Sequence, residues 1–321
     1  MPDIRYLEPE NLAKRIILID GLTRTGKSIF SHLVGTFTNH EHIQFLNPLE
    51  QVLSGLSLGS IDPSLARAFI RTYLNERVYD TMISRNSNFR HSDQTGVTNH
   101  PEPWLYFERL SKDDGDEVVQ ELRSTSRVFT FMTHDVMLNF PHFKFLLDDF
   151  KLIEVVRDPV AIAHSCYVRG WGKRFGTDAR SFTLCTSKAG VGVPWYATQS
   201  DIDWINMNEL ERCAWLASDL TQRLLRTLRS SSDRRVLVVC FERFVTETLS
   251  ELNRIADFLG QSPTDETYRQ LTLARCPRQL DSELRASQLG QFIQGIGPEH
   301  LEYLQASVHD YQYFVASEIG T

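Results

Sequence analysis

The sequence predicts an α/β fold in three layers, with helices on both faces of a central parallel sheet. Apolar runs of strand length occur at 16–19, 151–156 and 236–239. Segments of helix length separate these runs, and strands that alternate with helices are typical of a doubly wound parallel sheet. In addition, the first run passes directly into a glycine-flanked loop and then into a helical pattern. We therefore expect one α/β domain over 1–321.

The loop at 21–28 matches the spacing G-x-x-x-x-G-K-[ST] at every position, a pattern typical of loops that hold phosphate. Gly21 and Gly26 permit backbone dihedrals with φ > 0, which a tight anion-binding loop needs. The N–H groups at the start of the following helix favour a bound phosphate or sulfate. Arg24 and Lys27 add positive charge. The spacing therefore predicts a phosphate-binding loop, without saying which phosphate it binds.

Composition narrows the classes of function. The chain of 321 residues carries a net charge of −7, which argues against nucleic acid as the main partner, because binding to a phosphate backbone needs a basic surface. No apolar run approaches the roughly 20 residues that span a bilayer, and no signal-peptide pattern is visible at the N-terminus. The five cysteines are scattered without CxxC spacing, so we expect reduced thiols, no zinc site and a cytoplasmic protein.

The first half of the chain is expected to hold three helices and one loop insertion. A helix follows the phosphate-binding loop over 28–36, and a longer one runs over about 62–84, with Asp62 as its cap and a proline in its first turn. A third helix covers 113–123. The polar stretch 85–103 is punctuated by glycine and proline and is predicted to be a loop. It either lines a pocket for a polar acceptor or is a solvated surface loop.

His134 lies near the end of a β-rich run at 127–135. Open parallel sheets bind ligands at the carboxyl ends of their strands, so this histidine lies where chemistry is expected. A lone histidine is otherwise more often structural or on the surface, and both interpretations stay open at this point.

A second candidate for phosphate binding follows the strand at 151–156. Arg157 comes directly after this strand, and Pro159 starts a helix that carries Ser165 about two turns in. An arginine and a serine placed in this way could clamp a second phosphate. The alternative is that Arg157 and Asp158 form only a local ion pair.

The second half of the chain contains another insertion and three regular elements. The stretch 170–200 is rich in glycine, serine, threonine and aromatic residues, and we expect a loop insertion that acts as a lid or a binding loop. A long helix is predicted over 201–229, a buried strand over 234–241, and a helix over 244–259 that ends at a glycine.

These features together resemble the sulfotransferases that use 3′-phosphoadenosine 5′-phosphosulfate (PAPS). The loop at 24–28, Arg-Thr-Gly-Lys-Ser, is similar to the family's [KR]-[ST]-G-[TS]-[TS] loop. Arg157, Pro159 and Ser165 have the spacing of its R-x-P and following serine, which bind the 3′-phosphate in the family. Thr133-His134 resembles its K-T-H, whose histidine is the catalytic base.

The resemblance extends towards the C-terminus. The stretch 236–244, followed by Phe-Leu-Gly at 258–260, is similar to the strand, Y-E-D-L turn and F-L-G helix end of the family. More weakly, Arg285 with Gly290 and Phe292 partly resembles the R-K-G-x-x-G-x-W loop that contacts the 3′-phosphate.

The resemblance implies both a reaction and a set of site residues. A loop that binds the phosphosulfate would hold PAPS, a sulfuryl group would move to an acceptor hydroxyl or amine, 3′,5′-ADP (PAP) would be the product, and no metal would be required. His134 would take the acceptor proton, while Arg24 and Lys27 would stabilise the leaving oxygen. The residues implied to bind the donor are Arg24, Thr25, Gly26, Lys27, Ser28, Arg157, Ser165 and Arg285.

The sequence also departs from the family pattern. Met132 replaces the lysine before Thr-His, Lys27 stands where threonine is usual, and the C-terminal loop lacks its second basic residue and first glycine. The first departure weakens the assignment of the base, so a carboxylate such as Glu102 or Asp135 is an alternative to His134.

Two other functions are also compatible with the sequence, and the sequence indicates only a broad class of acceptor. A P-loop ATP-dependent kinase would place Lys27 on the β- and γ-phosphates and Ser28 on Mg²⁺, with Asp158 as the carboxylate that holds the metal. A nucleotide-binding module without activity is the third interpretation. The polar stretch 85–93 and the aromatic residues around Trp195 favour a carbohydrate or glycolipid acceptor over a small phenol. The sequence does not predict an oligomeric state.

Overall fold

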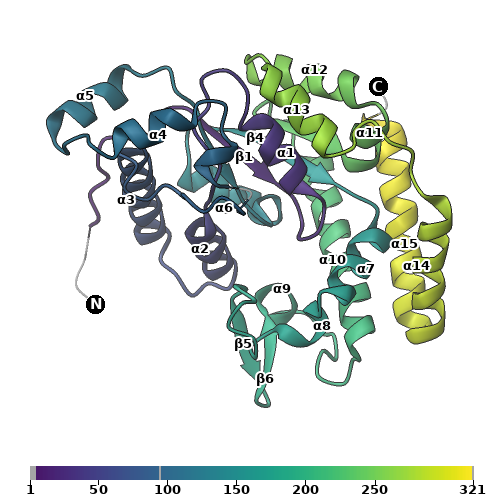
Figure 1. The fold of residues 1–321 in the computed structure, drawn as a ribbon. Helices are drawn as coiled ribbons and strands as arrows, with labels where there is room; N and C mark the ends of the chain where they lie inside the picture. Colours follow the sequence, from purple (N-terminus) through teal and green to yellow (C-terminus); the bar gives the residue numbers. More distant parts are fainter. Residues whose placement is uncertain (1–4, 94, 320–321) are drawn as a thin grey trace.

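The computed structural model describes residues 5–93 and 95–319 and is built around a parallel sheet (Figure 1). The sheet has five strands in the order β2-β3-β1-β4-β7, and all neighbouring pairs are parallel. The strands are β1 (Ile16–Asp20), β2 (Gln44–Phe45), β3 (Phe129–Met132), β4 (Lys151–Val156) and β7 (Val236–Cys240). The central parallel sheet expected from the sequence is confirmed.

Side chains on the central strands alternate between two hydrophobic cores. Leu18 of β1 packs with Phe131 and Leu152 on one face, whereas Ile19 packs with Ile153 on the other. Each of these side chains is at most 1% exposed. Because successive side chains of a strand point to opposite faces, a strand buried on both faces appears in the sequence as a continuous apolar run.

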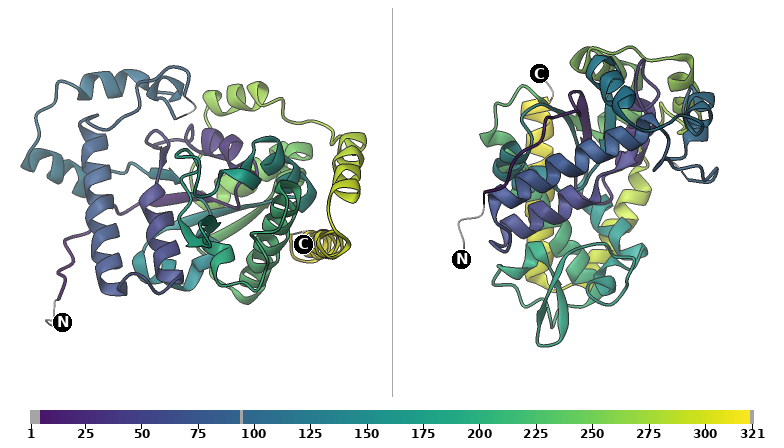
Figure 2. Two further views of the ribbon diagram at one scale, coloured as in Figure 1. Left: turned by 90° about the horizontal axis from the view of Figure 1, so that it is seen from below. Right: turned by 90° about the vertical axis from the view of Figure 1, so that its left-hand side faces the viewer.

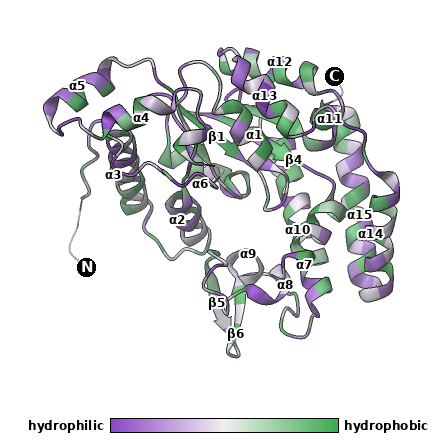
Figure 3. Cartoon of the chain, in the orientation of Figure 1, coloured by the Kyte–Doolittle hydropathy of each residue, from purple (hydrophilic) through white to green (hydrophobic). Residues whose placement is uncertain are grey.

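Helices cover both faces of the sheet and complete the three layers, and in Figure 3 the strands between them are largely green, the colour of hydrophobic residues. The core on one face is closed by α1 (Lys27–Val34), α11 (Phe241–Thr246), α12 (Thr248–Leu259) and α13 (Asp265–Leu273). The core on the other face is closed by α2 (Asn47–Ser57), α3 (Pro63–Met82), α5 (Asp116–Ser124), α6 (Phe140–Leu146), α7 (Pro159–Val168), α10 (Glu209–Ser230), α14 (Ser282–Gly295) and α15 (Pro298–Phe314). The three-layer α/β fold is therefore confirmed.

The remaining elements are short. They are α4 (Pro103–Arg109), α8 (Trp171–Arg174), α9 (Trp195–Thr198), the 3₁₀ helices η1 (Val97–Asn99) and η2 (Val136–Asn139), the π-helical turn η3 (Val315–Ile319) and the antiparallel strands β5 (Cys185–Lys188) and β6 (Val191–Pro194). Among the described residues, no helix is both long and apolar enough to cross a membrane.

The two insertions differ in how much regular structure they contain. The stretch 170–200, expected to be a loop, holds α8, the β5–β6 hairpin and α9 in sequence. Its Phe175 ring lies 5.7 Å from that of Trp204 and 6.2 Å from that of Tyr196, measured between centroids, so aromatic contacts fix this segment. The stretch 85–103 consists mainly of turns around η1, and position 94 lies outside the described residues.

Helix boundaries differ from expectation where caps decide them. The helix expected from position 201 begins only at Glu209, because the side chain of Asn208 accepts hydrogen bonds from the first turn and Glu211 closes a capping box. The helix expected over 244–259 is divided into α11 and α12. Gly260, at φ 67°, ends α12 as predicted.

The two ends of the chain contribute to opposite edges of the molecule. Figure 2 shows the dark blue helices of the N-terminal third on one side of the sheet and the yellow helices near the C-terminus on the other. Figure 1 identifies these as α2–α3 and α14–α15. Between them lie the carboxyl ends of the strands, and the loops that follow these ends form the candidate site.

Candidate active site

The predicted site residues follow neighbouring strands at one edge of the sheet. The phosphate-binding loop follows β1, His134 follows β3, and Arg157 follows β4. Since β3, β1 and β4 are adjacent and parallel, these segments lie together at the carboxyl edge, where open α/β sheets bind ligands. The first residue after β7, Phe241, adds an aromatic ring to this edge.

Two glycines fix the shape of the loop. Gly26 has φ 91° and directly precedes α1, and a Cβ at this position would lie 2.5 Å from Cε2 of Phe241. Gly21 has φ 146°, and a Cβ there would lie 2.5 Å from the carbonyl oxygen of Val155. Both positions therefore exclude any side chain, through the backbone conformation and through close contact. The Gly26–Phe241 contact also places an aromatic face against the loop.

Lys27 lies beneath the loop. Its ammonium group donates hydrogen bonds to the carbonyl oxygens of Gly21 (2.7 Å) and Leu22 (2.8 Å), and the residue is 4% exposed. Burial lowers its pKa, while the nearby carboxyls of Asp20 and Asp135 act in the opposite direction. The lysine therefore holds the loop in its curved conformation.

Thr25 and Ser28 complete the loop. Thr25 is also buried, and its hydroxyl donates to the same Leu22 carbonyl (3.0 Å). Ser28 lies in the first turn of α1 and is half-buried. Thr25 thus supports the loop, while Ser28 is the hydroxyl residue that lies at the start of the helix.

Arg24 faces away from Lys27, towards the segment after β4. Its Nε donates to Oγ of Ser165 (2.9 Å), and its carbonyl oxygen accepts from Nη1 of Arg157 (3.0 Å). The Arg24 backbone has φ 71°, a conformation that is uncommon outside glycine. Burial and the neighbouring cations Arg169 and Arg157 lower the pKa of Arg24. The structure therefore brings Arg24, Arg157 and Ser165 together, as the sequence predicts, in a group of positive charges that an anion would stabilise.

Arg157 lies over the ring of Phe241, with its guanidinium carbon 4.3 Å from the ring centroid. Its Nε is buried and has no hydrogen-bond partner among the described residues. A buried N–H group without a partner is costly. An acceptor oxygen from a ligand would satisfy it.

Asp158 does not pair with Arg157. Its carboxylate caps α7, accepting from the backbone N–H groups of Val160 (2.8 Å) and Ala161 (3.2 Å). The other oxygen accepts from Nε (2.8 Å) and Nη2 (2.7 Å) of Arg285. The local ion pair considered from the sequence is thus replaced by a pair that joins α14 to the start of α7.

A cavity of about 620 Å³ opens beside these arginines. Arg157, Arg278 and Arg285 line it together with Phe241, Glu242 and Tyr311. Tyr311 donates to Oε2 of Glu242 (2.6 Å), and Oε1 of Glu242 accepts from the backbone N–H of Asp158 (3.0 Å). Asp158 and Asp281 also line the cavity, but Asp158 is paired with Arg285 and Asp281 caps α14. The carboxylates therefore have partners within the protein, which leaves Arg157 and Arg278 as the cations facing an incoming anion.

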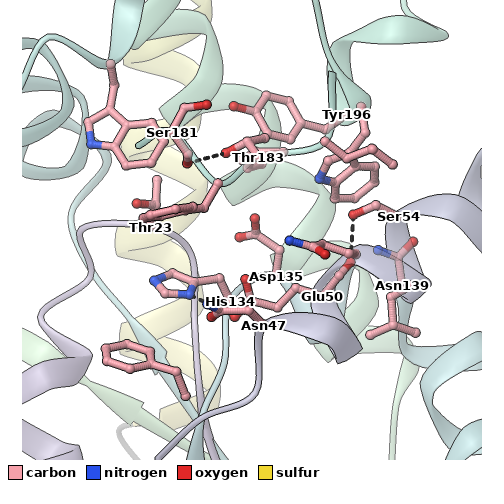
Figure 4. A pocket seen from close by; sticks show the side chains of 18 of the residues that line it. Thr23, Asn47, Glu50, Ser54, His134, Asp135, Asn139, Ser181, Thr183 and Tyr196 are labelled. Atoms are coloured by element: carbon pink, nitrogen blue, oxygen red, sulfur yellow. Dashed lines mark hydrogen bonds and ion pairs between the residues drawn. The ribbon is translucent and has the colours of Figure 1, made fainter. Parts of the chain in front are cut away.

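A second cavity, of about 330 Å³, is lined in part by Thr23 of the loop (Figure 4). His134 lines it, and its Nδ1 lies 3.0 Å from Oε1 of Glu50 on α2. Burial and the charge of Lys27 lower the pKa of His134 to about 3, so the imidazole is neutral at physiological pH. Burial raises the pKa of Glu50 to about 8. With so low a pKa the imidazole is a weak base by itself, and it can accept a proton effectively only if Glu50 takes up the proton on Nδ1.

The two alternative carboxylates occupy different places. Asp135 lines the same cavity as His134, at φ 61°, and burial raises its pKa to about 7. Glu102 instead precedes α4 and accepts a hydrogen bond from Arg127 (2.9 Å). In the described part of the chain, no group of three or more His, Cys, Asp or Glu side chains is arranged to hold a metal ion.

Three residues of this site were not predicted from the sequence. Glu50 lies far from the other motifs along the chain, although Pro48 in the first turn of α2 was an available signal for that helix. Arg278 belongs to a segment between α13 and α14 without a recognisable motif. Phe241 was visible only as the end of a strand, and its proximity to Gly26 depends on the sheet order.

Comparison with known proteins identifies the family of the chain. The family model of the sulfotransferase domain matches residues 14–296, whereas no curated protein matches the chain. Three similar solved structures illustrate the range of the fold neighbours. Sulfotransferase STF9 from Mycobacterium avium shares 14% identity at a TM-score of 0.44, covering 95% of this chain and 77% of that one.

The other two neighbours are similarly distant. The sulfotransferase domain of the Synechococcus PCC 7002 olefin synthase shares 13% identity at a TM-score of 0.46, with 97% and 99% coverage. Mouse sulfotransferase SULT7A1, solved with PAP, shares 10% identity at a TM-score of 0.42, with 97% and 87% coverage. At these values the assignment rests on the family model, which spans most of the chain. The chain belongs to the sulfotransferase domain family.

Proposed function

We propose that the protein transfers a sulfuryl group from PAPS to an acceptor hydroxyl, with PAP as the second product. The observation that carries this proposal is the presence of two adjoining cationic groups of residues next to Phe241. One is the loop with Arg24, and the other is the cavity lined by Arg157, Arg278 and Arg285. A donor with phosphate groups at both the 3′ and 5′ positions would satisfy both, whereas ATP has none at the 3′ position.

Different residues of the chain would bind the two phosphate-bearing ends of the donor. The N–H groups at the start of α1, with Ser28 and the Arg24 guanidinium, are the groups suited to the 5′-phosphosulfate. Lys27, Thr25 and Gly26 keep the loop in the shape that presents these N–H groups. The 3′-phosphate would be held by Arg157, whose buried Nε lacks a partner among the described residues, together with Ser165 and Arg285.

In the transfer step, the acceptor oxygen forms a bond to sulfur while the bond from sulfur to the bridging phosphosulfate oxygen breaks. The leaving oxygen gains negative charge, which the loop N–H groups and Arg24 would stabilise because they are already in place before the reaction. The acceptor proton goes to Nε2 of His134. Nδ1, which lies 3.0 Å from Glu50, then shares its proton with that carboxyl. We therefore propose the His134–Glu50 pair, and not His134 alone, as the base.

The second cavity, which is lined by His134 and Glu50, supports the proposal that the acceptor binds beside His134. A carbohydrate or glycolipid acceptor, favoured by the sequence, depends partly on residues 85–93. Among the described residues that line the cavity, none comes from this stretch, whereas Trp195 and Tyr196 do line it. An acceptor hydroxyl remains our proposal, and an acceptor amine is the alternative chemistry at the same base.

The decisive experiment is to compare ligands by thermal denaturation and then to measure transfer. We expect 3′,5′-ADP without Mg²⁺ to raise the melting temperature, since a ligand at 100 times its Kd adds about 2.7 kcal/mol to the free energy of unfolding. Stabilisation by Mg-ATP alone would contradict the proposal and favour a kinase. Binding of 3′,5′-ADP without any transfer of labelled sulfate across an acceptor panel would favour a binding module without activity.

A further inference from the structure

The cavity that contains His134 has walls of two kinds. Its apolar lining includes Phe45, which is 44% exposed, Phe182, which is 71% exposed, Leu184, which is 40% exposed, and Trp195. Exposed aromatic and aliphatic side chains gathered around one cavity are typical of a site that receives an apolar ligand. Polar side chains line it as well: Glu50, His134 and Asp135 form one group, and Ser181 and Thr183 lie opposite them (Figure 4).

Asp135 is the polar group of this end that has no assigned role in the transfer step. Its Oδ1 is buried and has no hydrogen-bond partner among the described residues. The backbone at Asp135 adopts φ 61°, which orients the side chain differently from that of an extended strand residue. In Figure 4 its carboxyl group lies between Glu50 and the residues Ser181 and Thr183 opposite.

A carboxyl group in this position lacks the hydrogen bonds that buried carboxyls normally make. The titratable groups that face it are the neutral imidazole of His134, the cation Lys27 and the acids Asp20 and Glu50. Lys27 directs its ammonium to the loop carbonyls of Gly21 and Leu22. A donor group on the ligand would therefore supply the missing partner.

We propose that the acceptor is an apolar molecule with a second hydrogen-bond donor next to its reacting hydroxyl, and that Asp135 binds this second donor. The inference rests on the proposed sulfuryl transfer. Since His134 and Asp135 are consecutive residues and both line the cavity, the two polar groups of the acceptor lie within a few bonds of each other. The second donor is a hydroxyl or an ammonium group, and the rest of the molecule contacts Phe45, Phe182 and Leu184.

The test uses four acceptors: decanol, its vicinal diol, its vicinal amino alcohol, and methyl glucoside. Sulfate transfer and thermal stabilisation in the presence of 3′,5′-ADP are measured for each. We expect kcat/KM and binding affinity for the diol or the amino alcohol to exceed those for decanol by about 10- to 100-fold, the range expected for a hydrogen bond to a carboxylate. A preference for the amino alcohol identifies an ammonium group, and a preference for the diol identifies a hydroxyl.

Three variants separate the role of the side chain from that of the backbone. Asp135→Gly removes the carboxyl while tolerating φ 61°, and the preference over decanol should disappear. Asp135→Asn keeps an accepting oxygen, so the preference for the diol should persist while a preference for the amino alcohol falls. Asn39→Gly makes the same kind of change at an exposed residue with φ 64°, and should leave all ratios unchanged.

The outcomes distinguish this inference from the proposed function. The inference is overturned if Asp135→Gly keeps the preference, or if the wild-type protein prefers decanol or methyl glucoside. If transfer to decanol and stabilisation by 3′,5′-ADP persist in those cases, the proposed function stands. If no acceptor is sulfated, the binding measurements still decide whether Asp135 recognises the second donor, while the proposed transfer itself fails.

Discussion

Arg24 and Lys27 lie three positions apart in one loop, yet their surroundings differ. The ammonium of Lys27 donates hydrogen bonds to two carbonyl groups of the loop. In contrast, the guanidinium of Arg24 donates to Ser165, and the carbonyl oxygen of Arg24 accepts a hydrogen bond from Arg157. From the sequence pattern alone, both residues are predicted to be positive charges that bind phosphate. The structure separates a residue that supports the loop from one that extends the cationic surface towards the segment after β4.

The proposed His134–Glu50 base leads to a prediction about pH. The pKa of His134 is lowered to about 3, so the imidazole itself does not titrate between pH 5 and 9. The pKa of Glu50 is raised to about 8, so this carboxyl loses its proton only as the pH rises through that value. Since an ionised Glu50 is the better acceptor for the Nδ1 proton, kcat/KM should rise with pH to a midpoint near 8.

Substitutions test which group produces this midpoint. His134→Ala should lower kcat by about 10²- to 10⁴-fold, the usual contribution of a general base. Glu50→Gln should retain some activity but lose the rise near pH 8, and Glu117→Gln, an exposed glutamate on α5, serves as the control. A midpoint that survives in Glu50→Gln would show that another group titrates.

At the scale of elements, the loop and α11 fit together through Gly26 and Phe241. A Cβ at Gly26 would lie 2.5 Å from the Phe241 ring, in a backbone with φ 91°. We expect Gly26→Ala to reduce the free energy of unfolding by about 2 kcal/mol or more, since backbone strain and overpacking each cost about 1–3 kcal/mol. Affinity for 3′,5′-ADP should fall as well, because the N–H groups at the start of α1 would shift.

A matched glycine separates strain from the steric contact. Gly59 is exposed with φ 67°, and a Cβ there would meet no heavy atom within 4 Å in the described chain. Gly59→Ala should therefore show the backbone cost of about 1 kcal/mol alone. Phe241 is itself buried in the core, so the contact is measured by a double-mutant cycle: in denaturant unfolding, Gly26→Ala should cost less in the Phe241→Ala background than in the wild type. Equal losses for the two glycine variants would rule out the contact as the cause.

The sequence was most informative for elements with a strong local signal. The strand at 151–156 has the predicted bounds, and the α3 helix begins after the Asp62 cap as expected. In contrast, α2 was not predicted, and Glu50 on this helix was missed with it. The contact between Glu50 and His134 depends on where the two-residue strand β2 places α2 at the sheet edge, and so short a strand gives little signal in the sequence. Arg278 was missed for a similar reason, since its place beside Phe241 is fixed by packing between distant segments.

At the scale of the whole molecule, the cavity lined by Arg157, Arg278 and Arg285 joins parts of the chain that are far apart in sequence. Arg157 follows β4, Arg278 precedes α14, and Arg285 lies on α14, where it pairs with Asp158. Chain segments from both halves must therefore be in place before this cationic surface exists. A ligand that contacts all of them would stabilise their arrangement, which a ligand with only a 5′-phosphate would do less well.

This arrangement predicts how nucleotide selectivity responds to substitution. Wild-type protein should bind 3′,5′-ADP more tightly than 5′-AMP. Arg285→Ala should reduce that preference by about 10-fold or more, because a charge-assisted hydrogen bond contributes about 1.5–3 kcal/mol. The carboxylate of Asp158 would also lose its partner and would repel the 3′-phosphate. Affinity for 5′-AMP should change by only a few-fold. Since the Arg285 side chain is 38% exposed, its ion pair should contribute less than about 1 kcal/mol to stability. Arg269→Ala on α13, which removes an ion pair to Glu266, is the matched control in titration calorimetry. Equal losses of affinity for both nucleotides, or the same effect in Arg269→Ala, would assign Arg285 a structural role and place the 3′-phosphate elsewhere.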